Sequence, residues 1–406
     1  MARAIENGHY VSFLEQTSHN FYNKNERYQS IVSQISNIFR VDVLTDFQTL
    51  YNAVETINSY RKIDAVIAPC EPSLEMISQV CQELGIKFTS PIGVQNARKK
   101  DVARHLLEEN NLESAKYAKV FSLEDAISSA QKIGYPVVVK PTSGFNSWIA
   151  ETVHTQAQLE SYFENALAQC DSVPEAYKEQ FNRGILVEEC LIGTLLSVEI
   201  GFDINGKRQD IIISGRAQSR ENECIELGSL IPGNVTKEQE AACYEYAEKV
   251  CNALNLDFGI FHIEIMLTDR GPVLVEANPR LMGGVMPTIY EYAIGKPVFD
   301  YVFDLYGCKA CDNNYPSAQQ TVTVRKIIPL EDGKINQDIN LEWLHHHDNI
   351  SIFYRDNIQS CQQVTAGQLL GRILVKGETF DAAKNTADQL LLNIENQIGF
   401  KLHHDI

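Results

Sequence analysis

Short apolar runs alternate with amphipathic stretches over the first 95 residues of the chain. Runs with the composition of buried strands lie at 9–14, 39–44, 63–68 and 85–88, and helical spacing of apolar residues occurs at 26–37, 46–60 and 72–84. Alternating strands and helices predict a mostly parallel sheet. Because this region contains no glycine-rich phosphate fingerprint, we do not expect a dinucleotide site in it.

Beyond residue 95 the same patterns continue with longer strands. They predict helices at 96–110, 123–133 and 237–254, and strands at 137–141, 185–190, 196–204, 208–215, 258–267 and 272–276. The last part, 318–406, is predicted to hold a strand, a helix near 340–346, a strand at 351–355 and a closing helix at 380–397. We find no internal repeat and no low-complexity segment.

The length of 406 residues is sufficient for two or three packed units with a large core. No apolar run is long enough to cross a bilayer, and the first eight residues lack the apolar stretch of a signal peptide. These features predict a cytoplasmic protein that has no contact with a membrane.

The chain is acidic, with 53 acidic and 35 basic residues and a formal net charge of −18. A broad nucleic-acid surface needs a basic stripe, so we do not expect nucleic acid as a partner. The ten cysteines are interpreted as reduced thiols. Cys308 and Cys311 formally fit C-x-x-C, but no second pair or nearby histidine completes a zinc set.

Acidic and amide side chains follow two strands that are predicted to form a hairpin around 268–271. The strand period of two places His262 and Glu264 on one face of the first strand, and Glu276 and Asn278 on one face of the second. If those faces coincide, two carboxylates and an amide oxygen converge. Such an oxygen-only set suits Mg²⁺.

The alternative interpretation is two exposed acids on an edge hairpin. Against it, Val273-Leu274-Val275 is too apolar for an edge strand. A buried pair of carboxylates without a cation is expensive, so we favour the metal site.

Glu264, together with Glu276-Ala277-Asn278-Pro279-Arg280, resembles the metal-binding block of the ATP-grasp superfamily. The following Leu281-Met282-Gly283-Gly284 is most similar to the branch of L-amino acid ligases, which are dipeptide-forming carboxylate–amine ligases. The resemblance covers about residues 85–305 by specific motifs and the rest by pattern. It implies an α/β ATP-grasp fold with an N-terminal Rossmann-like parallel α/β domain (1–95), an ATP-grasp first part with a small lid subdomain (96–187), and a catalytic part with a C-terminal α+β subdomain (188–406).

The resemblance implies ATP-binding residues at Lys100, Lys140, Ser143, Gly144, Ser147, Glu188, Glu189, Leu191 and Glu199. Lys100 is similar to the first nucleotide lysine and Lys140 to the second, although a lysine by itself is more often a solvated surface charge. Lys140 ends an apolar strand at a small-residue loop, which suggests a charge aimed at phosphate. The chain departs from several relatives in having Leu195 at the ribose-binding position, and Glu199 is the candidate for a shifted arrangement.

Metal ligands are implied at Glu264, Glu276 and Asn278, which would hold Mg²⁺ as two ions, with Mn²⁺ as an alternative. Substrate-binding residues are implied at Arg216, Glu226, Arg280, Gly283 and Gly284, and Arg280 and Lys140 are implied to be catalytic. Arg216 and Arg220 are both candidates for the arginine that faces phosphate or substrate. Glu226 contacts a substrate amino group or is a rim carboxylate, and His262 is interpreted as a structural hydrogen-bonding residue.

The resemblance implies an ATP-dependent ligase that joins a small-molecule carboxylate to an amine through an acyl phosphate, with an amino acid as the expected substrate. Two alternatives remain open: another acceptor, such as bicarbonate in a biotin carboxylase-like reaction, and a regulatory protein that binds nucleotide without turnover. A homodimer is expected from family habit alone. Relatives begin with a strand before the first helix, and in this chain that strand is predicted to be missing, replaced or differently placed.

Overall fold

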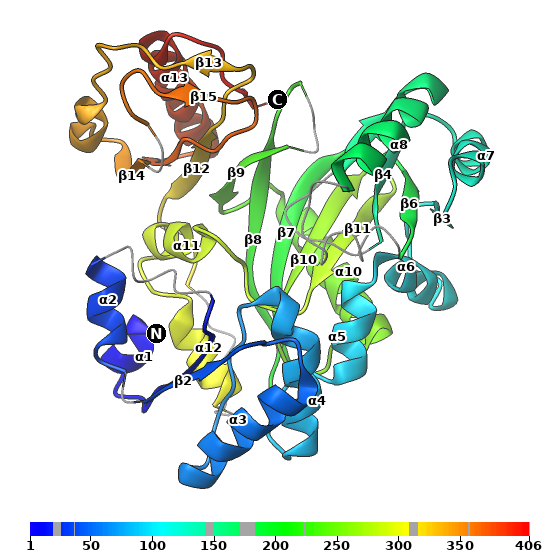
Figure 1. Ribbon diagram of the computed structural model, residues 1–406, viewed down its shortest axis with the longest axis vertical. Helices are drawn as coiled ribbons and strands as arrows, with labels where there is room; N and C mark the ends of the chain where they lie inside the picture. The colour runs from blue at the N-terminus through cyan, green and yellow to red at the C-terminus, as the bar shows by residue number, and fades with distance from the viewer. Residues whose placement is uncertain are drawn as a thin grey trace.

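The computed structural model of the chain (Figure 1) describes residues 1–18, 26–35, 37–142, 150–170, 183–221, 225–307, 316–355 and 358–405. Its largest element is an eight-stranded sheet in the order β11-β10-β7-β8-β9-β12-β16-β14. A four-stranded sheet, β3-β6-β4-β5, lies beside it, and a two-stranded parallel sheet, β1-β2, belongs to the N-terminal part.

The N-terminal part consists of α1 (Ala2–Glu6), β1 (Ser12–Gln16), α2 (Glu26–Val32), β2 (Asn37–Val41), α3 (Phe47–Tyr60), the 3-10 turn η2 (Glu71–Ser73) and α4 (Leu74–Glu83). The strands β1 and β2 pair in parallel, as predicted. The first strand of the chain lies after a helix, α1, which is anchored on α12 by the ion pair between Arg3 Nε and Asp300 Oδ1 at 2.7 Å.

Two predicted strands of this part, 63–68 and 85–88, are wrong because neither segment forms a strand. Ile63 and Val66 pack their side chains against the core without joining a ladder. Gly85 takes a φ of +66° just after α4, and the next amide, of Ile86, donates back to Cys81 O at 2.8 Å. The chain therefore leaves α4 through a capping turn.

The predicted helix at 96–110 is two helices, α5 (Pro91–Arg98) and α6 (Lys100–Glu109). Lys99 between them is extended, with φ −104° and ψ 101°. The amide of Lys100 donates instead to Thr142 O at 3.0 Å. The break thus links α6 to the end of β4.

The four-stranded sheet carries two helices on its core side, and all of its strands pair antiparallel. The elements are β3 (Tyr117–Val120), α7 (Leu123–Ile133), β4 (Val137–Pro141), β5 (Glu151–Val153), α8 (Gln156–Cys170) and β6 (Ile185–Glu189). Ser122 caps α7 by accepting from Asp125 N, and Gly134 ends the helix at the predicted place. Val137, Val139 and Val187 belong to a core of this unit's own residues.

The large sheet is antiparallel in the pairs that carry the candidate site. Its strands are β7 (Thr194–Phe202), β8 (Arg208–Gln218), β9 (Glu226–Ile231), β10 (Gly259–Thr268), β11 (Gly271–Asn278), β12 (Thr321–Ile327), β14 (Ile350–Arg355) and β16 (Gly371–Gly377). The remaining elements are α10 (Lys237–Leu254), α11 (Met286–Ile294), α12 (Phe299–Tyr306), β13 (Gly333–Lys334), η3 (Glu342–His346), β15 (Gln363–Val364) and α13 (Phe380–Ile398).

The helix α10 covers one face of the sheet at β7, β10 and β11 and has the predicted bounds. Thr236 and Gln239 form a capping box at its start, and Asn255 ends it in the left-handed conformation. Ile263 and Ile265 of β10 share a core with its buried residues. The alternate positions of β10, such as His262 and Glu264, therefore project from the opposite face, which α10 does not cover. Within the described residues, no helix combines the length and apolarity needed to cross a bilayer.

Candidate functional site

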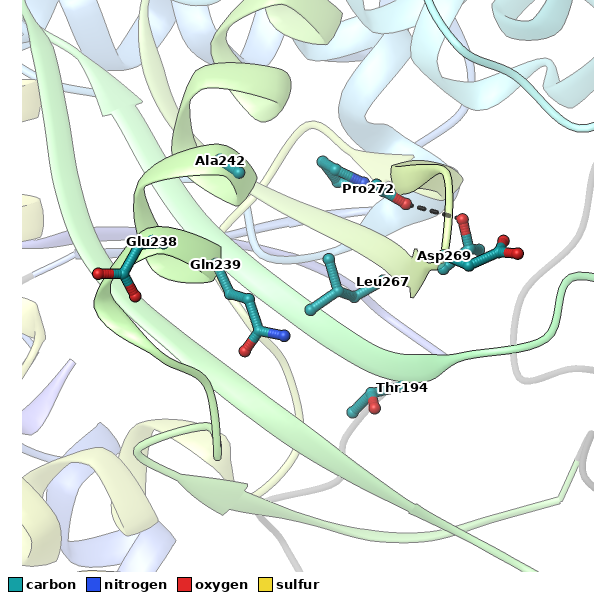
Figure 2. Close-up of a pocket in the computed structure, with 9 residues that line it drawn as sticks. Thr194, Glu238, Gln239, Ala242, Leu267, Asp269 and Pro272 are labelled. Atoms are coloured by element: carbon teal, nitrogen blue, oxygen red, sulfur yellow. Dashed lines mark hydrogen bonds between the residues drawn. The ribbon is translucent and has the colours of Figure 1, made fainter.

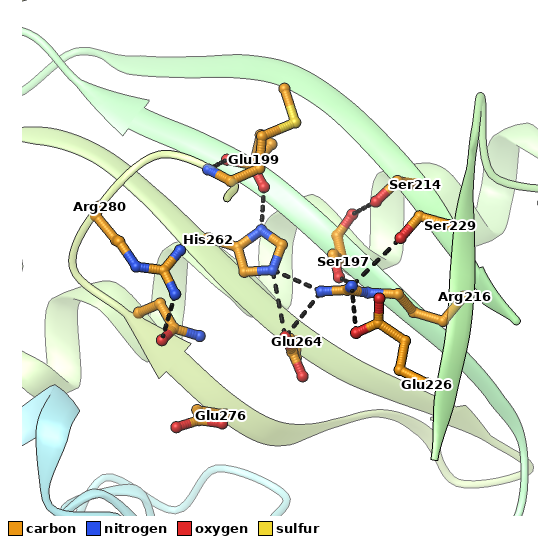
Figure 3. Close-up of polar contacts among 12 residues, drawn as sticks. Ser197, Glu199, Ser214, Arg216, Glu226, Ser229, His262, Glu264, Glu276 and Arg280 are labelled. Carbon is orange, nitrogen blue, oxygen red and sulfur yellow. Dashed lines mark hydrogen bonds and ion pairs between the residues drawn. The ribbon is translucent and has the colours of Figure 1, made fainter. Parts of the chain in front are cut away.

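Polar side chains form two rows across three neighbouring strands (Figure 3). They lie on the face of the sheet opposite α10, because Ile263 and Ile265, which alternate with them on β10, share a core with that helix. In the first row Glu264 of β10 lies opposite Ser197 of β7 and Glu276 of β11. In the second row His262 lies opposite Glu199 of β7 and Asn278 of β11. The sequence-based expectation that the two faces of the hairpin coincide is confirmed by this register.

Arg216, on β8, connects the first row to the neighbouring strands. Its Nε donates to Ser197 Oγ at 2.8 Å, its Nη2 pairs with Glu264 Oε1 at 2.8 Å, and its Nη1 pairs with Glu226 Oε2 at 2.9 Å. The side chain is only 6% exposed. Burial lowers the pKa of Arg216, but the charges of Glu264 and Glu226 outweigh it and raise the pKa.

His262 is buried between two carboxylates. Its Nδ1 contacts Glu199 Oε1, and its Nε2 lies 3.3 Å from Glu264 Oε1. Burial lowers the pKa of His262, whereas the charge and hydrogen bond of Glu199 raise it, and the net pKa is about 9. These contacts agree with the interpretation of His262 as a hydrogen-bonding residue. Glu199 also accepts from the amide of Met282 at 3.0 Å, and its contact with ribose stays a prediction.

The carboxylates of Glu264 and Glu276 stand opposite each other and are partly accessible, with 23% and 27% of the side chains exposed. Burial raises the pKa of Glu264, but Arg216 and the hydrogen bond from His262 hold that pKa well below its usual range. Lys100 Nζ pairs with Glu276 Oε1 at 2.8 Å. An ionised carboxylate of this kind is a hard oxygen ligand.

The donor set of Glu264, Glu276 and Asn278 fits Mg²⁺, because two carboxylates and an amide oxygen lie on one face of one hairpin. Among the described residues, no three His, Cys, Asp or Glu side chains gather into a metal site. Mg²⁺ prefers six oxygen ligands, so substrate phosphates and waters would have to complete the shell around these three residues.

Arg280 follows Asn278 and lies at the edge of the two rows. Its Nη2 pairs with Glu71 Oε2 at 3.2 Å and lies 3.5 Å from Asn278 Oδ1. A methyl group added at Gly283 would meet Arg280 Nη1 at 3.5 Å, so the backbone of Gly283 runs alongside the guanidinium. Gly284, the next residue, has a φ of +59°. The fold thus brings Gly283 beside Arg280, and Gly284 follows it directly in the chain.

Lys140 lies in a second cluster of charges, where the four-stranded sheet meets α6. Glu188 of β6 accepts from Arg104 Nε at 2.8 Å and from Lys140 Nζ at 2.5 Å. Burial raises the pKa of Glu188, but the charges of Arg104 and Lys140 dominate and lower it to about 2. Arg104 Nη2 also donates to Val275 O at 2.9 Å, which ties this cluster to β11.

Other predicted residues lie apart from these rows. Glu189 pairs outward with Arg270 at 2.8 Å, and Leu191 is half-buried just beyond β6. The guanidinium of Arg220 donates to Asp405 O, whereas that of Arg216 pairs with Glu264 and Glu226, so Arg216 is the arginine that contacts the site carboxylates. Ser143, Gly144 and Ser147 fall outside the described residues.

Several residues that contact the predicted set were missed in the sequence, among them Ser197, Lys326 and Glu71. Ser197 is a polar residue in an apolar strand, a signal that strand alternation supplies. Lys326 of β12, whose Nζ donates to Glu226 O at 3.1 Å, and Glu71 of η2 come from distant parts of the chain. Only the register of the sheet and the packing of the N-terminal part bring them to the site.

A separate pocket of about 370 Å³ opens on the other side of the hairpin (Figure 2). It is lined by residues of α10, such as Glu238, and of the β10–β11 turn, such as Asp269. It shares no lining residue with the two polar rows, so it takes no part in the chemistry considered below.

The ATP-grasp domain family matches residues 133–289 of this chain. Among solved structures, an L-amino acid ligase from Bacillus licheniformis superposes with a TM-score of 0.75 at 18% identity, covering 99% of this chain and 94% of that one. N5-carboxyaminoimidazole synthase from Aspergillus clavatus gives a TM-score of 0.69 at 17% identity, covering 97% and 94%. Residues 133–289 thus match the ATP-grasp domain family, and the chain as a whole has the fold of these ATP-grasp-like solved structures, as the sequence resemblance implied.

The curated relatives are much longer than this chain, which matches only part of each. Human carnosine synthase 1 is 25% identical over 258 residues, which are 61% of this chain and 29% of the relative. The large chain of carbamoyl phosphate synthase from Methanoregula boonei is 24% identical over 304 residues, which are 73% of this chain and 26% of that one. The chain spans little more than a quarter of the length of these relatives.

Proposed function

We propose that the protein is an ATP-dependent ligase that joins a carboxylate to an amine through an acyl phosphate, with an amino acid as substrate. One observation carries the proposal: the oxygen ligands Glu264, Glu276 and Asn278 share one face of the hairpin, and each is contacted by a cation, Arg216, Lys100 and Arg280 respectively. The ATP-grasp fold supports it, since the similar solved structures include one named as an L-amino acid ligase.

The proposed reaction follows from the chemistry of the carboxyl group. A carboxylate is a poor electrophile, and ATP converts it into an acyl phosphate that an amine attacks with loss of phosphate. Lys100 and Lys140 are proposed to bind the phosphates of ATP. Both lysines already lie against carboxylates of the site, Glu276 and Glu188, so both are held at its border before nucleotide binds.

Glu264, Glu276 and Asn278 would hold Mg²⁺, which, when bound, supplies charge neutralisation for the phosphates. Arg216 keeps Glu264 ionised and fixed, because it pairs with that carboxylate from the neighbouring strand. Lys100 holds Glu276 in place through the ion pair of its Nζ with Oε1 at 2.8 Å. The residues around the ligands therefore orient the oxygens that a hard cation requires.

Arg280 is proposed to bind the acyl phosphate and to stabilise the oxyanion that forms when the amine attacks. Its guanidinium is 18% exposed and lies beside the backbone of Gly283, and the amide groups of Gly283 and Gly284 are proposed to assist it. Removal of one such donor costs about 3 kcal/mol of transition-state stabilisation.

The test is release of ADP from Mg·ATP across pairs of amino acids and other small carboxylic acids, with mass detection of the product. We expect ADP and a condensed product with particular pairs only. Glu276→Ala should make neither, whereas Glu55→Ala, which removes an exposed acid from α3, should retain activity.

Two other results of this ADP-release test would contradict the proposed ligase reaction. ADP released with bicarbonate, and with no amine, would replace the ligase by a carboxylating reaction. ATP binding without ADP release for any acceptor would favour a regulatory protein. The domain boundaries at 95 and 187 and the homodimer remain proposals alongside the substrate.

A further inference from the structure

The segment 402–405, Leu-His-His-Asp, lies beside the ends of the strands that carry the substrate side of the site (Figure 1). Isolated bridges join Leu402 to Pro329 and Asp405 to Ser219. The amide of Arg220 donates to His404 O at 3.0 Å. Residues far beyond the ATP-grasp motifs therefore pair with the chain just after β8.

Asp405 contacts two strands of the large sheet at once. Its Oδ1 accepts from the amide of Gln218, the last residue of β8, at 3.1 Å. Its Oδ2 accepts from Arg325 Nη2 of β12 at 2.9 Å. In the sheet, β9 lies between β8 and β12. One carboxylate thus fixes the two strands that flank β9.

The first residue of β9, Glu226, is held by cations from the same two strands. Arg216 of β8 reaches its Oε2 at 2.9 Å, and Lys326 of β12 lies 3.6 Å from its Oε1. Arg216 precedes Gln218 by two residues, and Lys326 follows Arg325 directly. A shift of either strand end would therefore move a cation relative to Glu226.

The ion pair between Asp405 and Arg325 is also costly to break. The side chain of Arg325 is fully buried and that of Asp405 is 10% exposed. A buried ion pair that loses one partner leaves an uncompensated charge, and the strand ends must then move or admit water. The pair therefore specifies one spacing of β8 and β12.

We propose that Asp405 is a positioning residue for the substrate side of the site, acting through β8 and β12 on Arg216, Lys326 and Glu226. This inference rests on the proposed function, because it takes Arg216 and Glu226 as the residues next to substrate. It assigns to the 402–405 segment a part in substrate affinity and none in nucleotide binding.

The test compares Asp405→Asn with a matched control, Glu395→Gln. Asn keeps the size and an acceptor oxygen but removes the charge that pairs with Arg325. Glu395 of α13 accepts from the amide of Leu402 and from His404 Nε2, each at 2.9 Å, so it holds the same segment from the other side. Hydrogen exchange of β9 should be at least tenfold faster in Asp405→Asn than in Glu395→Gln, with exchange of β10 and β11 equal in both.

The second readout uses an amino acid pair that yields ADP with the unmodified protein. Asp405→Asn should raise KM for the amino acid about tenfold while KM for ATP and kcat stay within twofold. Equal exchange of β9 in the two variants, or equal rises of KM for ATP and the amino acid, would overturn the inference. If no pair yields ADP at all, the proposed function fails, and the exchange of β9 alone still decides whether Asp405 positions the strand.

Discussion

Glu188, in the charge cluster around Lys140, shows what pairing does for a buried charge. Its carboxylate is 4% exposed and receives both Arg104 and Lys140. Burial alone would favour the neutral acid, but two cations keep the group ionised. Arg104, with 2% of its side chain exposed, depends on this partner in return.

Glu188→Gln should lower the free energy of unfolding by about 3 kcal/mol, because Arg104 would keep its charge in a buried place without a counterion. The neighbouring Glu189→Gln is the matched control. Its partner Arg270 is 39% exposed, so the loss should be below about 1 kcal/mol. Urea unfolding measures both, and equal losses would contradict the role given to Glu188.

The same carboxylate predicts a dependence of stability on pH. Its folded pKa of about 2 lies below the ordinary value of 4.5, so its contribution is full above pH 4.5 and is lost as pH falls toward 2. The difference in unfolding free energy between the unmodified protein and Glu188→Gln should therefore shrink over that interval. If this difference in unfolding free energy stays constant between roughly pH 5 and pH 3, Glu188 does not titrate as stated.

At the scale of elements, β9 is held unusually close to β12. A methyl group at Gly228 would lie 1.9 Å from Val324 O, closer than any packing allows. Only glycine lets the two backbones approach in this way. Glu226 and Ser229, both partners of Arg216, lie within two residues of this contact.

Gly228→Ala should destabilise the protein by about 3 kcal/mol, the upper range of overpacking, and should weaken substrate binding because β9 is displaced. Gly283→Ala provides the contrast. Its added methyl would meet Arg280 at an ordinary 3.5 Å, so the melting temperature should change little even though activity falls. Similar melting temperatures for the two variants would refute the close approach as the cause.

The hairpin of β10 and β11 and the helix α10 were predictable because alternation and capping residues are local signals. The strand at 63–68 was not excluded by its pattern, since an apolar run packs equally well in extended chain without a ladder. The residues of the candidate site also fall into a predictable and an unpredictable group. Glu264, Glu276 and Asn278 follow from strand period, whereas Glu71 and Lys326 depend on contacts between distant segments, which local pattern does not encode.

For the whole molecule, the described residues form several separate hydrophobic cores. The four-stranded sheet and the C-terminal helix α13 each have a core of their own, and α10 shares another with the large sheet. A ligand that contacts more than one of these units adds stability to the native state as a whole.

Mg·ATP at 100 times its Kd should therefore stabilise the protein by about 2.7 kcal/mol and raise the melting temperature. Glu276→Ala should abolish most of the rise that depends on Mg²⁺, and Glu55→Ala should leave it intact. Thermal shifts with ATP alone, Mg²⁺ alone and both together make the measurement. A rise that is the same with and without Mg²⁺ would argue against the metal site on the hairpin.

The order of strands in the large sheet also bears on how the chain is made. β9 pairs with β12, but β12 comes much later in the chain. Its first residue, Thr321, lies 90 positions after Ile231, the last residue of β9. While synthesis proceeds at about 5–20 residues per second, β9 waits for seconds with one edge unpaired. Its residues Leu227, Leu230 and Ile231, all buried in the finished protein, make that edge a site for association with other chains. We therefore expect nascent protein to be exposed to aggregation through β9 in the interval before residue 327 has emerged.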